Sequence, residues 1–257
     1  MAALNQRPAS MKSQRFDPRR DAYGQIVWSH FHGKKSYEIV ERDDGLFDLS
    51  GGAKAYFAEF SNWPKHQRAA IRFAKGRVLD VGAGAGRVSL YLQNNGLSVT
   101  AIDNSPLAIR VCKRRGVKDA RVLSIERIEN FKSAIFDSVV MYGNNFGLFG
   151  RPSKARALLK TLHKITRPTA LIIAESADPY KTDDPAHRAY RRLNRQRGRM
   201  AGQLRIRIRF RDYVGSWFDY LIVSQTEMRD ILRGTGWKVR KVFHSESYPY
   251  VAVLDKT

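Results

Sequence analysis

Cysteine is almost absent from this chain of 257 residues. The single one, Cys112, excludes an internal disulfide and any zinc site built from cysteines. Its place in a predicted helix indicates a packed thiol. A chain without disulfides fits a reducing compartment, so we expect a cytoplasmic protein.

Long apolar runs are missing as well. No stretch approaches the roughly 18 residues that a membrane-spanning helix needs, so we expect no membrane partner. Residues 1–20 hold five basic side chains against Asp17 and contain no apolar segment. This composition argues against a secretory signal and predicts a disordered basic tail.

Acidic residues are scarce relative to basic ones. The chain has 46 Lys and Arg against 24 Asp and Glu, a formal net charge of +22. Such a surface attracts polyanions, of which nucleic acid is the usual one. A lineage bias toward arginine explains the same numbers equally well, so charge alone does not choose a substrate.

Strands and helices alternate over most of the chain. Residues 21–75 predict an N-terminal helical cap, and residues 76–257 a core domain with an insertion at about 178–222. Within the core, the predicted strands are 77–81, 98–102, 120–123, 136–141, 169–175, 237–243 and 249–254. Helical patterns separate the first five of these strands, which is typical of an α/β fold with a doubly wound, mostly parallel sheet.

A glycine run follows the first predicted strand of the core. Asp80 ends the strand, and Gly82, Ala83, Gly84 and Gly86 lead into a helical pattern. Glycines at such a turn let the backbone amides and the positive end of the helix approach a ligand. A dinucleotide fingerprint needs G-x-G-x-x-G, and its last glycine is replaced here by Arg87.

A second acid, Asp103, ends the next strand, 23 residues beyond Asp80. With this acid, the pattern D-x-G-x-G-x-G resembles the class I S-adenosylmethionine-dependent methyltransferases. The resemblance covers roughly residues 56–175 and implies a Rossmann-like, seven-stranded sheet and S-adenosylmethionine as the cofactor. It also implies that Asp103 binds the ribose diol, with Asn104 and Ser105 near the adenosine.

The resemblance implies further contacts at two later strand ends. Family members often have an acid and a small residue at the adenine end, where this chain reads Leu123-Ser124-Ile125-Glu126. We expect Ser124 and Ile125 there, with a displaced Glu126 as the alternative. The fourth strand ends at Tyr142 and Gly143, which we expect to face the methyl donor.

The residues that follow predict the acceptor side, where Asn144, Asn145 and Phe146 are the candidates. This segment lacks the prolines of the N/D-P-P-Y/F/W signature, which counts against methylation of exocyclic base amines. Cys112 is too distant in sequence for a pyrimidine C5 mechanism. We name no catalytic residue and predict no metal site, although His30 and His32 in the cap could face the pocket.

An arginine-rich segment forms the predicted insertion. Between residues 204 and 211, apolar residues alternate with arginines, which predicts one strand of a hairpin with a cationic face. In similar methyltransferases, insertions here form a lid over the substrate. Arg205 and Arg207 are therefore candidates for binding an anionic acceptor or an RNA backbone, and a solvated basic face is the alternative.

These patterns predict methyl transfer, with a small molecule as the expected acceptor and RNA as the alternative. The missing nucleobase signature favours the first, and the net charge favours the second. Aminopropyl transfer would need acids to hold a polycationic acceptor, and the arginines of the insertion argue against it. The sequence predicts neither the acceptor atom nor the oligomeric state.

Overall fold

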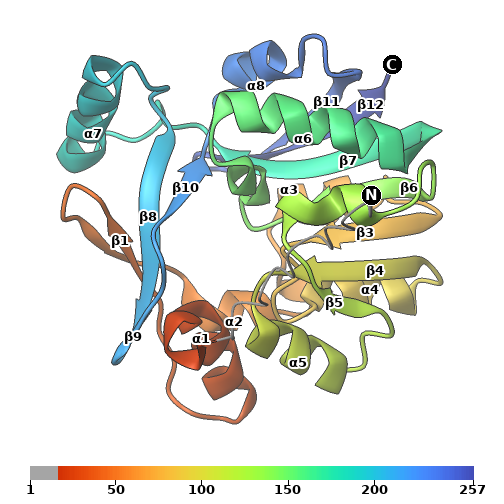
Figure 1. Ribbon diagram of the computed structural model, residues 1–257, viewed down its shortest axis with the longest axis horizontal. Helices are drawn as coiled ribbons and strands as arrows, with labels where there is room; N and C mark the ends of the chain where they lie inside the picture. Colours follow the sequence, from red (N-terminus) through yellow and green to blue (C-terminus); the bar gives the residue numbers. More distant parts are fainter. Residues whose placement is uncertain (1–16) are drawn as a thin grey trace, which may run out of the picture.

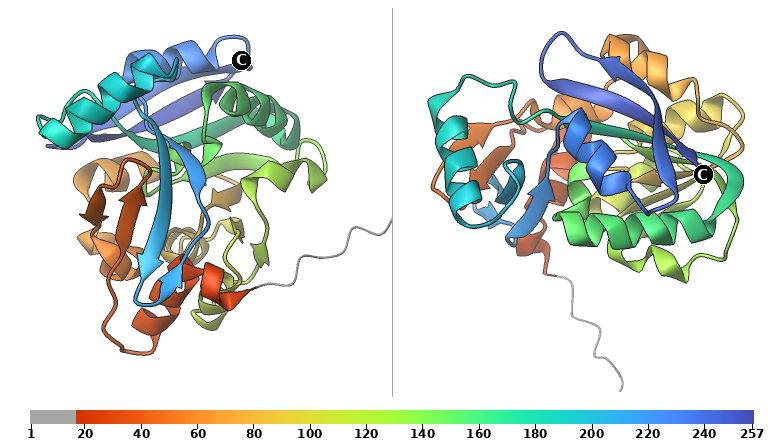
Figure 2. Two further views of the ribbon diagram at one scale, coloured as in Figure 1. Left: turned by 60° about the vertical axis from the view of Figure 1, so that its left-hand side comes forward. Right: turned by 90° about the horizontal axis from the view of Figure 1, so that it is seen from above.

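The chain folds around two β-sheets, and the computed structural model describes residues 17–257. A seven-stranded sheet forms the core of the molecule, and a five-stranded sheet stands beside it (Figures 1 and 2). Most of the predicted basic tail lies outside the described residues. The last part of that tail, Pro18–Arg20, forms a short 3-10 helix.

The seven-stranded sheet has the order β11-β12-β7-β6-β3-β4-β5. Its strands are β3 (Arg77–Val81), β4 (Ser98–Asp103), β5 (Ala120–Val122), β6 (Phe136–Met141), β7 (Thr166–Ala177), β11 (Trp237–His244) and β12 (Pro249–Lys256). Strands β3 to β7 run parallel, whereas β12 is antiparallel to both β7 and β11. The predicted Rossmann-like, doubly wound, mostly parallel sheet is therefore confirmed.

Helices cover both faces of this sheet (Figure 1). Helices α3 (Lys65–Ile71), α4 (Arg87–Asn94) and α5 (Pro106–Arg114) pack on one face, and α6 (Pro152–Ile165) and α8 (Gln225–Leu232) pack on the other. The predicted starts of two helices are confirmed. Ser105 caps α5, with Pro106 as its first residue, and Ser224 caps α8 in a capping box with Glu227.

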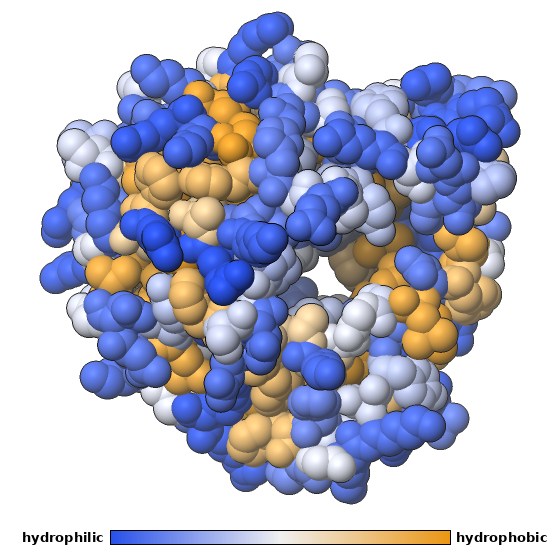
Figure 3. All heavy atoms as spheres, turned by 180° about the vertical axis from the view of Figure 1, so that it is seen from behind, coloured by the Kyte–Doolittle hydropathy of each residue, from blue (hydrophilic) through white to orange (hydrophobic). Residues whose placement is uncertain are grey.

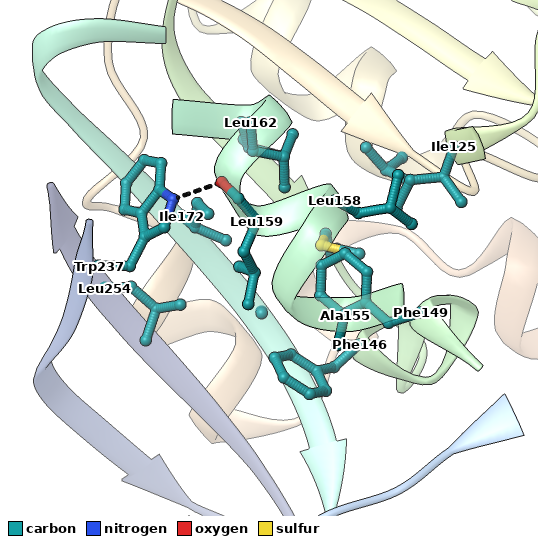
Figure 4. Close-up of a cluster of buried hydrophobic side chains, with 14 of the residues drawn as sticks. Ile125, Phe146, Phe149, Ala155, Leu158, Leu159, Leu162, Ile172, Trp237 and Leu254 are labelled. Carbon is teal, nitrogen blue, oxygen red and sulfur yellow. Dashed lines mark hydrogen bonds between the residues drawn. The ribbon is translucent and has the colours of Figure 1, made fainter. Parts of the chain in front are cut away.

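The larger hydrophobic core lies between α6 and the seven-stranded sheet (Figure 4). Leu159 and Leu162 of α6 point toward Ile172 of β7, and Trp237 packs at the edge of the cluster. The indole N–H of Trp237 donates to the carbonyl oxygen of Leu159 at 3.0 Å, which satisfies its polar group inside the apolar surroundings. This core fixes the strand ends that carry the site.

The second sheet joins the cap to the insertion. Strand β1 (Ile39–Arg42) pairs with β2 (Phe47–Leu49) on one side and with β8 (Gln203–Phe210) on the other. Strand β8 also pairs with β9 (Tyr213–Val214) and β10 (Phe218–Leu221). All pairs are antiparallel, as predicted for the hairpin. The cap is helical in α1 (Ala22–Phe31), α2 (Gly52–Phe57) and α3, but the sequence analysis did not predict its two strands.

The second sheet has one apolar and one cationic face. Ile206, Ile208 and Phe210 pack toward α1, whereas Arg205 and Arg207 alternate with them and point the other way. Helix α7 (Pro185–Gln196) covers the end of β8 (Figure 1). The surface is deeply hollowed between the two sheets, and apolar side chains form part of the wall (Figure 3).

Candidate functional site

The glycine loop between β3 and α4 has the backbone that the sequence predicted. Gly82, Gly84 and Gly86 have φ values of +71°, +57° and +79°, a region that side chains rarely adopt. Gly86 also faces Cys112, whose buried thiol has a pKa raised to about 12 by burial. Ala83 donates its N–H to the carbonyl oxygen of Ile102 at 3.0 Å, which ties the loop to β4.

Two buried carboxyls lie beside this loop. Asp103 accepts hydrogen bonds from the N–H groups of Gly84 at 3.0 Å and Ser105 at 2.9 Å. Asp80 accepts from the hydroxyl of Ser89 at 2.6 Å. Burial raises the pKa of each carboxyl to about 6, and the hydrogen bonds only partly oppose this effect.

Helix α1 closes over the loop from the cap side. The hydroxyl of Ser105 donates to Asp21 at 2.8 Å and accepts from the N–H of Ala108 at 3.0 Å. A Cβ added to Gly84 would collide with the hydroxyl of Tyr23, so this tyrosine lies directly against the loop. Ser105 therefore anchors the cap, a role that its sequence position did not reveal.

The loop after β6 forms the opposite side of the site. Asn145 donates its amide N–H to the carbonyl oxygens of Val81 at 2.9 Å and Gly82 at 3.1 Å, so this predicted acceptor residue supports the glycine loop. Asn144 has a left-handed backbone, with φ at 60°. Its side-chain oxygen is buried without a hydrogen-bond partner in the part of the chain that the structure describes. A buried polar atom without a partner marks a place where a ligand can donate.

Glu175, at the end of β7, holds this second loop. It accepts hydrogen bonds from the N–H of Gly143 at 2.6 Å, from His66 at 3.1 Å and from Gln67 at 2.8 Å. These contacts keep its pKa below the usual range although burial opposes this. Arg87 extends the network by donating to Gln67 at 3.0 Å.

The sequence analysis missed Glu175, although a signal was present. Like Asp80 and Asp103, it is an acid at the carboxyl end of an apolar strand, where α/β sheets place their ligand sites. His66 could not be singled out, because only the fold brings α3 against β7.

The cap contributes an acid that the sequence analysis also missed. Glu38 precedes β1 and is 4% exposed. It accepts hydrogen bonds from the hydroxyls of Tyr56, at 2.8 Å, and Ser50. Burial raises its pKa above the usual range, and the two hydrogen bonds oppose the rise.

Tyr220 links the second sheet to the site. Its hydroxyl donates to the carbonyl oxygen of Asn144 at 2.7 Å, and its ring packs against Gly147. Burial raises its pKa, as do the negative charges of Glu175 and Glu38.

Several predicted site residues have other roles. Phe146 is fully buried in the core instead of facing an acceptor (Figure 4), and the hydroxyl of Tyr142 donates to the backbone of Gln67 at 2.8 Å. Ser124 caps the short helix Ile125–Asn130, and Ile125 packs in the core. Asn104 is exposed at the end of β4.

The two cap histidines lie away from the glycine loop. His30 contacts Ser36 and the ring of Phe57, and His32 is an exposed residue whose ring contacts the carbonyl oxygen of Trp28.

The two candidate arginines of the insertion are paired with acids. Arg205 lies 3.0 Å from Asp219, and Arg207 forms a bidentate pair with Glu41 at 2.7 and 2.8 Å. The Arg207 guanidinium lies over the ring of Trp217, with its Cζ atom 4.4 Å from the ring centroid. These residues occupy the outer face of the second sheet, so no contact in the structure directs them toward the glycine loop.

The described residues fit S-adenosylmethionine. The glycine loop exposes its backbone, and Asp103 offers a carboxylate for the ribose hydroxyls. Asn144 offers a side-chain oxygen that can accept a hydrogen bond from the ligand. Between residues 17 and 257, no cluster of three or more His, Cys, Asp or Glu side chains could hold a metal ion. No helix in that range is both long and apolar enough to cross a membrane.

The comparisons with known proteins agree with this geometry. Residues 79–174 match the protein family described as "Methyltransferase domain". A SAM-dependent methyltransferase from Bacteroides fragilis, solved with S-adenosyl-L-homocysteine, has a similar structure with a TM-score of 0.80 and 28% sequence identity, over 96% of this chain and 100% of that one. Together these findings support a class I S-adenosylmethionine-dependent methyltransferase, with S-adenosylmethionine as the methyl donor.

Other relatives match over shorter stretches. The ubiquinone biosynthesis O-methyltransferase of Xanthomonas oryzae pv. oryzae is 37% identical over 115 residues, 43% of this chain and 48% of that protein. The chain thus spans about half the length of the curated relatives that it matches. A methyltransferase from Methanosarcina mazei shares the fold alone, with a TM-score of 0.57 and 18% identity over 70% of this chain and 92% of that one.

Proposed function

We propose that this protein transfers a methyl group from S-adenosylmethionine to a small-molecule acceptor bound between the two sheets. The observation that carries the proposal is the pair of contacts that joins helix α1 and the second sheet to the core. Asp21 bonds to Ser105 on the donor side, and Tyr220 bonds to Asn144 on the acceptor side. These contacts hold the cap over the glycine loop, and the surface is hollowed between the two sheets (Figure 3).

The chain's own residues supply binding and orientation. Asp103 receives the ribose hydroxyls, the glycine loop lets the donor approach the backbone, and Glu175 fixes the loop that carries Asn144. The donor brings an activated methyl group on a sulfonium, so in-line positioning and exclusion of water are the main requirements. The enclosure of the site by α1 and β10 serves both requirements.

The experiment is to incubate the protein with donor carrying a labelled methyl group and with separated metabolite, RNA and protein fractions. We expect label in the metabolite fraction, and mass spectrometry then identifies the product. Calorimetry with S-adenosylhomocysteine tests the donor half separately. If the wild-type protein does not bind S-adenosylhomocysteine, the proposed function is lost.

RNA is the second candidate acceptor, and the net charge of +22 is the observation that favours it. Phosphate contacts by several arginines would make RNA affinity fall steeply with salt. Binding that is absent at low salt, or unchanged between about 50 and 200 mM salt, would exclude RNA. The pairing of Arg205 and Arg207 with acids already reduces the free positive charge on that face.

A further inference from the structure

The acceptor side of the site is acidic although the whole chain is strongly basic. Glu38 lies in the cap, where Tyr56 donates to it, and Glu175 accepts from Gly143 in the loop that carries Asn144. Burial first, then the charges of Asp103 and Glu38, raise the pKa of Tyr23. The hydroxyl of Tyr23 lies against Gly84, whose N–H donates to Asp103. Its ring meets that of Tyr56, which bonds to Glu38.

Three tyrosines surround this acidic space. Tyr23 and Tyr56 meet edge to face, with ring centroids 5.3 Å apart. Burial, then Glu38 and Tyr23, raise the pKa of Tyr56, and Tyr220 adds a further contribution. Tyr23 lies against Gly84 of the donor loop, and Tyr220 reaches the loop after β6. The tyrosine rings thus line the region where the methyl donor and its acceptor must meet.

Only one oxygen of Glu38 is used by its neighbours. Both hydroxyl donors, Ser50 and Tyr56, bond to Oε2, and Oε1 accepts no hydrogen bond from any residue between 17 and 257. By contrast, Glu175 uses both oxygens and Asp103 uses both. A carboxylate that is held through one oxygen presents the other to a ligand.

A carboxylate with tyrosine rings around it has the chemistry of a cation site. Positive charge is attracted to aromatic faces, and a carboxylate adds a charge-assisted hydrogen bond. We propose, resting on the function given above, that the acceptor is a primary or secondary amine that binds as its ammonium ion, with Glu38 as the group that receives its proton. The sequence had offered an anionic acceptor as one possibility, and this inference differs from it.

The transfer balances without a further reactant. The ammonium gives one proton to Oε1 of Glu38, and the free nitrogen lone pair then forms a bond to the methyl carbon. The bond from that carbon to sulfur breaks, and its electron pair stays on sulfur, which leaves S-adenosylhomocysteine. The proton on Glu38 departs to solvent with the product.

The binding experiment uses choline as the cation and 3,3-dimethyl-1-butanol as its neutral analogue of the same shape. Protein saturated with S-adenosylhomocysteine is titrated with each, and saturation-transfer NMR measures the two affinities. We expect choline to bind at least about tenfold more tightly than the alcohol. Equal affinities would overturn the proposal while leaving donor binding, and hence the proposed function, intact.

Two variants locate the cation. Glu38→Gln keeps a hydrogen-bond acceptor for Tyr56 but removes the charge, and it should reduce choline affinity at least about fivefold. Glu41→Gln is the matched control. Glu41 is also a buried acid, three residues further along the chain in β1, but it pairs with Arg207 on the other face of the sheet. It should leave choline affinity unchanged. Equal losses in both variants, or no loss in Glu38→Gln, would contradict the assignment.

The labelled product gives an independent test. We expect an N-methyl product, and Glu38→Gln should then lower kcat by about a hundredfold or more while KM changes less. An O-methyl product would overturn the amine assignment. Thermal unfolding of Glu38→Gln is compared with that of the wild type, so that the loss of kcat is not a loss of folded protein.

Discussion

The hydroxyl of Tyr220 donates a hydrogen bond to the carbonyl oxygen of Asn144 at 2.7 Å. This bond connects β10 of the second sheet to the loop after β6 of the first. Asn144 has a left-handed backbone and a buried side-chain oxygen without a partner among residues 17–257. The acceptor side therefore depends on a contact between two segments that are far apart in the sequence.

Tyr220→Phe should change acceptor binding and leave donor binding intact. The ring still packs on Gly147, but the loss of one hydrogen bond of about 1 kcal/mol frees the loop that carries Asn144. We expect KM for the acceptor to rise about fivefold, and calorimetric affinity for S-adenosylhomocysteine to stay within about twofold of wild type. Tyr180→Phe is the control, because it removes a hydroxyl that bonds to Glu227 at the surface. A matching loss of donor affinity in Tyr220→Phe would show that the two sides are not separate.

Asp103→Ala should weaken donor binding. A carboxylate that accepts two ribose hydrogen bonds contributes about 1.5–3 kcal/mol for each bond, so we expect a loss of affinity of about a hundredfold or more. Calorimetry with S-adenosylhomocysteine measures the change. An affinity within about threefold of wild type would remove Asp103 from the donor site.

Donor affinity should also fall as the pH falls through about 6, the value to which burial raises the pKa of Asp103. Only the ionised carboxylate accepts both ribose hydrogen bonds, so affinity at pH 5 should be about tenfold below its plateau. The α-amino group of the ligand titrates near 8, above this range. Asp103→Asn should flatten the profile between about pH 5 and 7.

The same carboxyl acts on stability in the opposite direction. Because its pKa is higher in the folded protein than in the unfolded chain, the folded state binds the proton more tightly between about pH 4 and 6. The contribution of Asp103 to stability therefore rises as the pH is lowered across this range. A urea titration of the ligand-free protein and of Asp103→Asn isolates this contribution. If the unfolding free energy of the wild type, relative to Asp103→Asn, fell as the pH was lowered from about 6 to about 4, the raised pKa would be contradicted.

Gly86→Ala should destabilise the fold more than Gly96→Ala. Both glycines have a positive φ, +79° and +82°. A Cβ on Gly86 would lie 2.7 Å from the sulfur of Cys112 and 2.8 Å from Val117, whereas Gly96 has nothing within 4 Å. We expect a loss of about 2–4 kcal/mol for Gly86→Ala, from overpacking and backbone strain, and about 1–2 kcal/mol for Gly96→Ala, from strain alone. Urea unfolding measures both, and equal losses would show that the contact with Cys112 relaxes freely.

The parallel part of the fold could be predicted because its signals are local. Apolar strands, glycine stops and the Ser105-Pro106 cap each act within a few residues, and the structure confirms the elements that they predicted. The strands of the cap were missed because β1 and β2 form only a short hairpin, which joins a larger sheet when β1 pairs with β8, more than 160 residues away. No local pattern records such a partner.

The site residues also divide into those that local sequence patterns predict and those that depend on distant contacts. Asp80, Asp103 and the glycines could be found from spacing, because one strand-turn-helix unit sets their geometry. Phe146 was assigned to the acceptor from its position in the chain alone. In the structure its side chain is fully buried in the larger hydrophobic core. No sequence signal marks Glu38, because the role proposed for it depends on tyrosines from three other elements.

The second sheet is assembled from residues 39–49 and 203–221, while the donor pocket is built from residues between them. Substitutions in either outer segment can therefore reshape what the enzyme accepts without disturbing how it holds its methyl donor. Exchanging these two segments is therefore a direct way to test whether they determine acceptor specificity.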